Sequence, residues 1–147
     1  MHKKMKTNAL PRFFALSALC LALYAGCAGG LPVIPEDLSV LQFFQRAQEE
    51  FEYSNWDNAL YYYHTFIERH PDDLPHVTEA RYEIAFIHYK QKKYEEAAKD
   101  FRELLDFYDT TDLPLAFPLW PRVLSQRVLQ IMKDGGFLPK EDLTAEE

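Results

Sequence analysis

Apolar side chains recur at intervals of three and four residues from Val40 to Ile131, and no window alternates with a period of two. This spacing predicts four amphipathic helices between residues 40 and 108, because such intervals place apolar side chains on one face of a helix. The polar turns "SNWDNA" (54–59) and "KKYEEA" (92–97) each separate two of these helices. The pattern therefore predicts an all-α fold built from two helix-turn-helix pairs.

The two pairs are related by a repeat with an offset of 38 residues. At this offset like residues coincide: Ala47 with Ala85, Trp56 with Tyr94, Ala59 with Ala97, Tyr63 with Phe101, and Phe66 with Leu104. The alanine positions have a mechanical reason, because small side chains let two antiparallel helices approach closely. Repetition at this length is typical of solenoid folds.

The segment "PLWPRVLSQRVLQIMKDGG" (118–136) predicts a fifth helix, which Pro121 can start and Gly135 can end. Its expected apolar stripe consists of Trp120, Leu124, Val128 and Ile131. Because two repeat units leave an outer face uncovered, we expect this stripe to cap the second unit.

The segment "HYKQKKYEEAAKDF" (88–101) resembles the tetratricopeptide repeat, a helix-turn-helix unit of about 34 residues. The resemblance extends from about Val40 to Asp109, with four additional residues expected in the loop between the units. Lys92 stands where the family has a turn glycine. The resemblance implies a short tetratricopeptide-like superhelix of two units with a C-terminal capping helix, over residues 38–134.

The N-terminal residues have the order of a bacterial export signal. A basic segment (3–12) precedes fourteen uncharged residues (13–26), a run shorter than the roughly 20 residues of a membrane-spanning helix. Ala25 and Gly26 are followed by Cys27. This order resembles the lipobox of bacterial lipoproteins, in which the cysteine is acylated and begins the mature chain.

The lipoprotein resemblance implies a signal peptide (1–26), then a lipidated Cys27 with a proline-rich tether (27–37). Because Ala28 rather than aspartate follows the cysteine, it also implies lipid anchoring to the outer membrane, facing the periplasm. The alternative is an ordinary secretory signal in which Cys27 is incidental. Residues 135–147 are acidic and lack periodicity, and we expect them to form a loose tail.

Charge excludes one class of partner. Four of the 16 Lys and Arg lie within residues 1–26, which leaves 12 against 23 acidic residues and a mature net charge of −11. Such a surface repels nucleic acid. Cys20 would leave with the signal and Cys27 would carry lipid, so we expect no disulfide.

Catalytic and metal-binding signatures are missing from the sequence. There is no Ser-His-Asp order and no glycine-rich phosphate loop, so we expect no enzyme and no cofactor. One loop clusters His70, Asp72, Asp73 and His76. Their spacing matches no zinc signature, and we expect capping and solvated roles rather than a metal.

Aromatic side chains give the strongest functional indication. Tetratricopeptide proteins commonly bind partners along the first helix of each unit, and the resemblance assigns this role to Leu41, Phe44, Gln48, Phe51, Tyr82, Phe86 and Tyr89. The functional interpretation is a surface for a protein segment. The alternative is that the fifth helix and the tail "GGFLP" (135–139) simply cover these rings.

The segment "LQFFQRAQEEFEYSNWDNALYYYHTFIERHPDD" (41–73) resembles the first repeat of the BamD family of outer-membrane lipoproteins. The resemblance implies a membrane-anchored scaffold that takes part in assembly of outer-membrane β-barrel proteins. Two alternatives remain: an accessory subunit of a periplasmic transport or cell-envelope system, and a small-molecule binder with an aromatic cleft between the units.

Overall fold

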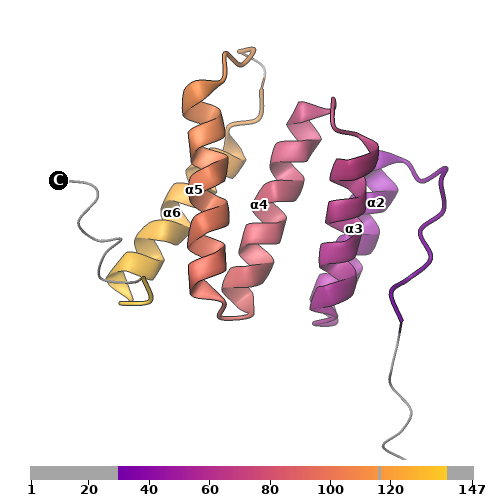
Figure 1. Cartoon of the computed structure of the whole chain (residues 1–147), viewed down its shortest axis with the longest axis horizontal. Coiled ribbons are helices and arrows are strands. Elements are labelled where there is room, and N and C mark those ends of the chain that lie inside the picture. The colour runs from indigo at the N-terminus through magenta and orange to yellow at the C-terminus, as the bar shows by residue number, and fades with distance from the viewer. Residues whose placement is uncertain (1–29, 116, 139–147) are drawn as a thin grey trace, which may run out of the picture. The chain divides into compact units, whose positions relative to one another are not determined.

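A computed structural model describes residues 30–115 and 117–138, so Cys27, the expected signal peptide and residues 139–147 lie outside the described part. By its internal contacts the chain divides into the units Met1–Gly30 and Leu31–Glu147. The described residues contain no strand. Their helices all belong to the second unit: α2 (Val40–Glu52), α3 (Trp56–Arg69), α4 (Leu74–Lys90), α5 (Tyr94–Thr110) and α6 (Trp120–Asp134) (Figure 1). The predicted all-α fold is confirmed.

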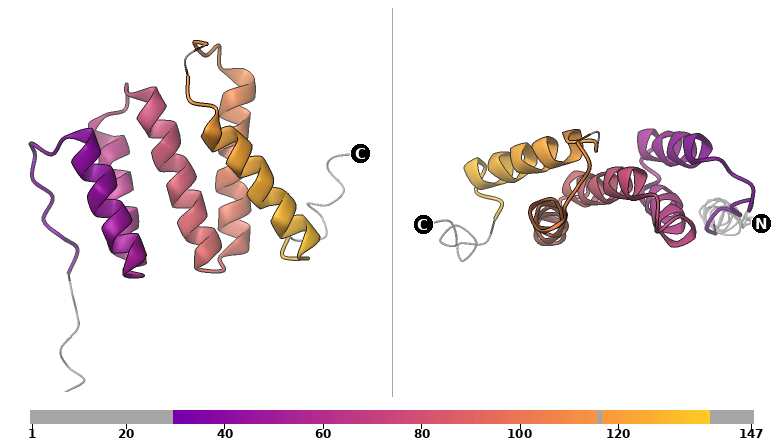
Figure 2. Two further views of the ribbon diagram at one scale, coloured as in Figure 1. Left: turned by 180° about the vertical axis from the view of Figure 1, so that it is seen from behind. Right: turned by 90° about the horizontal axis from the view of Figure 1, so that it is seen from above.

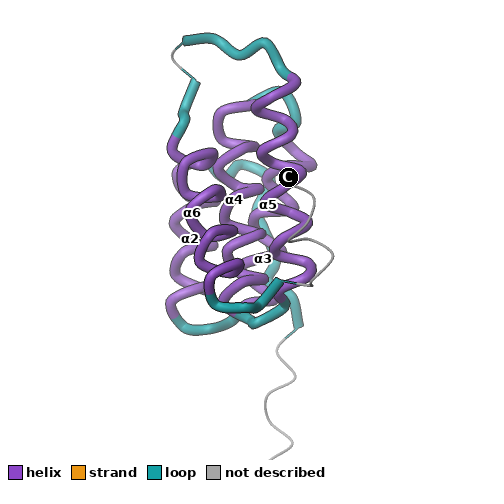
Figure 3. Tube along the Cα trace, turned by 90° about the vertical axis from the view of Figure 1, so that its left-hand side faces the viewer, coloured by secondary structure: helices purple, strands orange, loops and turns teal. Residues whose placement is uncertain are grey.

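The helices of the second unit form two layers. Helices α2, α4 and α6 lie in one layer, which we call the first layer, and α3 and α5 lie in the other (Figure 2). The strongest packing is within the pairs α2–α3 and α4–α5, and α4 also contacts α2, α3 and α6. Seen from the side, the connecting loops lie at the two ends of the helices (Figure 3). This is the expected order of two helix pairs followed by a capping helix.

The small residues at the repeat positions allow the close packing of each pair. Ala47, Ala59, Ala85 and Ala97 are all fully buried. Large rings fill the space beside them, and Phe43, Phe66 and Phe101 are among the largest fully buried side chains. Phe43 therefore contributes more to the core than the neighbouring Phe44, which is half-buried.

The four additional residues of the repeat lie in a helix and not in the expected loop. Helix α4 begins 34 residues after α2 and ends 38 residues after it, because α4 has 17 residues and α2 has 13. The loop between α3 and α4 contains only residues 70–73. Four residues are about one helical turn, so the insertion lengthens α4 without rotating its faces.

The three helices of the first layer end in the same way. Ser54 (φ 61°), Lys92 (φ 63°) and Gly136 (φ 68°) each follow a helix end in the left-handed conformation. The next residue, Asn55, Lys93 or Phe137, donates its N–H to a carbonyl of the last helical turn at 2.9 Å. This hydrogen-bond pattern is typical of helix C-termini, where glycine is preferred. Helix α6 thus terminates like the first helix of a repeat.

The buried stripe of α6 differs from the predicted one. Pro121, Ser125, Val128 and Met132 are buried, whereas Trp120, Leu124 and Ile131 are 38–45% exposed. Val128 alone belongs to both stripes. The prediction was wrong because Ser125, a polar residue, occupies a core position. Its hydroxyl donates a hydrogen bond to the Pro121 carbonyl at 2.7 Å, which satisfies the buried oxygen.

The segments that flank the helices also pack on the domain. Ile34 and Leu38 are buried, and the Arg69 guanidinium donates to the Pro35 carbonyl at 2.7 Å. Part of the segment expected as a tether therefore belongs to the folded domain. On the other side, the Phe137 ring stacks on Tyr94 with centroids 4.5 Å apart.

Candidate functional site

Aromatic rings run across the first layer from α2 to α6. The Phe51 ring of α2 stacks on Phe86 of α4 with centroids 6.1 Å apart, and Phe86 stacks on Tyr82 at 5.9 Å. The Tyr82 ring then meets the edge of Trp120 of α6 at 5.2 Å. We call this row, together with Tyr89, which lies 5.9 Å from Phe86, the aromatic face. Three helices contribute to it, so only the folded domain assembles it.

The predicted partner-binding residues divide into three groups by exposure. Leu41 is 76% exposed, and Gln48 is also exposed. Phe51, Phe86 and Tyr89 are half-buried and keep accessible ring area on the aromatic face. The remaining two face the core. Phe44 packs against Phe66 at 5.3 Å, and Tyr82 is 7% exposed.

The two interpretations of these rings, partner surface or covered core, apply to different residues. Helix α6 covers Tyr82 through Trp120, and Phe137 packs on Tyr94 at the end of the face. Phe51 and Phe86 retain exposed area beside this cover. The assignment of partner-binding residues stays a prediction, and we expect Phe51, Phe86 and Tyr89 to contribute most to it.

Two glutamates lie among the rings of the aromatic face. Tyr82 and Glu83 lie three and four residues after Glu79, and Phe86 lies four and three residues after them, which places all four on one side of α4. Burial, together with the negative charge of Glu79, raises the pKa of Glu83 from the ordinary 4.5 to about 7. Burial and Glu83 also raise the pKa of Tyr82 to about 12 and that of Tyr63 still further. The aromatic face therefore carries two carboxylates beside its rings. Sequence reasoning missed these glutamates, although a pair of carboxylates one turn apart inside an aromatic stripe was the available signal.

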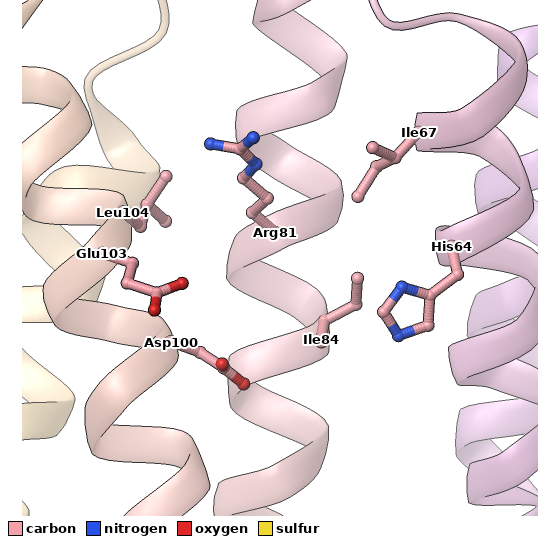
Figure 4. Close-up of a pocket in the computed structure, with 7 residues that line it drawn as sticks. All are labelled: His64, Ile67, Arg81, Ile84, Asp100, Glu103 and Leu104. Carbon is pink, nitrogen blue, oxygen red and sulfur yellow. The ribbon is translucent and has the colours of Figure 1, made fainter.

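A polar pocket lies on the opposite side of α4. It encloses about 290 Å³ and is lined by His64, Ile67, Arg81, Ile84, Asp100, Glu103 and Leu104 (Figure 4). Its two carboxylates have partners within the domain. Asp100 accepts from His88 at 2.7 Å, and Glu103 pairs with Lys99 at 3.7 Å. The pocket contains none of the predicted partner-binding residues, and nothing in the sequence pattern indicated it.

The inter-repeat loop has structural roles. The Asp73 carboxylate accepts a hydrogen bond from His76 Nδ1 at 2.9 Å, and the His70 ring packs on Phe66 at 5.0 Å. Within residues 30–115 and 117–138, no group of three His, Cys, Asp or Glu is arranged to hold a metal ion. No helix in this part of the chain is long and apolar enough to cross a membrane.

Comparison with known proteins identifies the second helix pair. Residues 79–111, which span most of α4 and all of α5, match the tetratricopeptide repeat family. The chain contains a tetratricopeptide repeat. This repeat indicates a scaffold for protein–protein interaction and agrees with the paired helices, their short turns and their small residues at the contacts. The first pair, α2 and α3, has the same architecture outside the matched region.

The chain also resembles an uncharacterised protein of Treponema pallidum (strain Nichols). The two are 28% identical over 107 residues, which are 73% of this chain and 43% of the relative. The chain thus spans less than half the length of this relative. No solved structure matches the chain significantly.

Proposed function

We propose that the protein is a lipid-anchored scaffold on the periplasmic side of the outer membrane, where its aromatic face binds a protein partner. The observation that supports this proposal best is the row of half-buried rings Phe51, Phe86 and Tyr89 beside α6. Water alone would favour polar residues at such positions, whereas aromatic side chains are the commonest anchors of protein interfaces. The tetratricopeptide repeat supports the same class of function.

The proposed anchor is a lipidated Cys27, which rests on the sequence resemblance to a lipobox. Stable membrane attachment requires more than one acyl chain, and a lipoprotein cysteine carries several. Cys27→Ser should abolish incorporation of radiolabelled palmitate and leave unlipidated precursor. Palmitate that persists in the variant would overturn the anchor without affecting the aromatic face.

The proposed cellular role is help in assembling outer-membrane β-barrel proteins, as the resemblance of residues 41–73 to the BamD family implies. The alternative role is an accessory subunit of a periplasmic transport or cell-envelope system. Co-purification of the native protein from detergent-solubilised membranes separates these roles, because barrel-assembly components would accompany it only in the first case.

The binding face is tested with Phe86→Ala and Tyr89→Ala. We expect each to weaken partner recovery about thirtyfold, the effect of losing about 2 kcal/mol of interface energy. Tyr53→Ala is the matched control, since Tyr53 is 79% exposed and has no ring contact within the described residues. The melting temperature of each variant separates binding from folding. Recovery that falls only in proportion to folded protein would show that these rings serve the core.

A further inference from the structure

The proposed scaffold carries two carboxylates at its aromatic face that have no ion-pair partner within the described residues. Glu79 and Glu83 are half-buried and lie one turn apart on α4. Within the described residues, the ion pairs join other groups: Asp73 with His76, Asp100 with His88, Glu103 with Lys99, and Asp109 with Arg122. No ion pair or hydrogen bond in that part of the chain involves the carboxylates of Glu79 or Glu83. On the helix both lie on the same side of α4 as Phe86, and neither is paired with a cation within the described residues.

Two carboxylates in this position are unfavourable unless something compensates them. Partial burial removes water from a charged group, and a neighbouring like charge adds repulsion. The pKa of Glu83, raised to about 7, reflects both effects. A cation between Glu79 and Glu83 would relieve the repulsion and supply the missing partner.

The rings of the same face already attract a cation. Lys90 Nζ lies 6.0 Å from the centroid of the Phe86 ring, an arrangement that is favourable because the ring face carries negative electrostatic potential. The aromatic face thus combines apolar area with two features that favour positive charge.

We propose that the aromatic face binds a partner segment that presents a Lys or Arg side chain between apolar side chains, with the cation held by Glu79 and Glu83. The flanking apolar side chains would pack on Phe51 and Phe86. This inference deepens the proposed function and rests on it.

Other occupants are disfavoured by the same charges. An acidic segment would be repelled, and a purely apolar segment would bury both carboxylates without a partner. A second copy that docked through the same face would bring the same two carboxylates into the interface from each side, because a two-fold contact repeats the same patch on both sides. A basic, apolar segment gives both carboxylates a cation and covers the exposed ring area of Phe51 and Phe86.

The test uses the full-length chain in detergent and a displayed library of random short peptides. We expect selection to enrich peptides with Lys or Arg flanked by apolar residues. Glu79→Gln and Glu83→Gln should each weaken binding of these peptides about tenfold, since each removes one partner of a partly buried charge pair. Glu68→Gln, at an exposed position of α3 in the other layer, is the matched control and should leave binding unchanged.

The outcomes separate this inference from the proposed function. Enriched peptides that are uncharged or acidic, or basic peptides that bind Glu83→Gln as tightly as the parent chain, would overturn the cation preference. If those peptides still lose affinity with Phe86→Ala, the binding face itself stands. A library without any peptide that depends on Phe86 would overturn both. Phe86→Leu replaces Phe86→Ala if thermal melting shows that the alanine variant does not fold.

Discussion

Replacing Glu83 by glutamine should stabilise the domain at alkaline pH. Glutamine keeps the shape of the side chain and removes only its charge, which burial and Glu79 make unfavourable in the fold. The folded-state pKa of about 7 lies above the ordinary value of 4.5, so the folded protein binds this proton more tightly than the unfolded chain does. The destabilisation by the ionised carboxylate is therefore complete above pH 7, falls as the pH decreases towards 4.5, and is absent below that.

The magnitude follows from the two pKa values. Their difference corresponds to about 3 kcal/mol, because each pKa unit is worth about 1.4 kcal/mol. Glu83 is only half-buried, and screening by water reduces this figure, so we expect a gain of about 1 to 2 kcal/mol in the free energy of unfolding at pH 8. At pH 5 the gain should largely disappear.

The assay is urea unfolding of the full-length chain in detergent at pH 8, 6 and 5, followed by circular dichroism. Glu68→Gln is the control, since an exposed glutamate should change the stability by little at any of these pH values. Equal stability of Glu83→Gln and the parent chain at pH 8, or a gap that does not narrow at pH 5, would refute the reasoning. A variant less stable than the parent at pH 8 would show that a cation within the protein already pairs with Glu83.

Four further substitutions test the packing and the turns. Lys92→Gly should raise the free energy of unfolding by about 0.5 to 1 kcal/mol in a urea melt, because glycine adopts the left-handed conformation at φ 63° without strain; a loss of stability would contradict this. Met132→Ala should lower the free energy of unfolding by about 2 to 4 kcal/mol and Ile131→Ala by less than about 1 kcal/mol, since Met132 is fully buried and Ile131 is 45% exposed. The reverse order of the two losses would support the buried stripe predicted from sequence. Tyr108→Phe should lower the free energy of unfolding by about 1 kcal/mol and with it the melting temperature, because the Tyr108 hydroxyl donates to the Pro118 carbonyl at 2.7 Å. An unchanged melting curve would show that this hydrogen bond does not stabilise the α5–α6 connection.

The helix pairs were predictable because two independent signals agreed. Periodicity marked each helix, and the offset of 38 residues placed Ala47 and Ala85 at equivalent contacts, where both are now seen to be buried. The same offset could not show where the four additional residues lie. A full turn added to α4 keeps its apolar faces in the same direction, and a longer loop would produce the same offset. Residue spacing therefore gave the architecture, and only the structure shows that the insertion lies in α4.

The spacing of apolar residues could not predict the buried face of α6 or the two half-buried carboxylates of the aromatic face. Helix α6 has apolar residues around more than half of its circumference, so hydrophobicity alone could not choose between Ile131 and Met132 for the core. The choice depends on Ser125, which is buried because its hydroxyl bonds within the helix. Similarly, a glutamate in a helix is usually solvated, whereas Glu83 is half-buried and close enough to Tyr63 and Tyr82 to raise the pKa of both.

The two ends of the second unit are closed to different degrees. At the N-terminal end, Ile34 and Leu38 pack on the core and Arg69 holds the Pro35 carbonyl. At the other end α6 packs on α5 and α4 and leaves Leu124 and Ile131 partly exposed. In a solenoid, stability is approximately a sum over neighbouring elements, so an end helix with exposed apolar area opens most easily. Amide protons of α6 should consequently exchange with solvent before those of α2 and α3, and the domain should unravel from its C-terminal end while the α2–α3 pair stays folded.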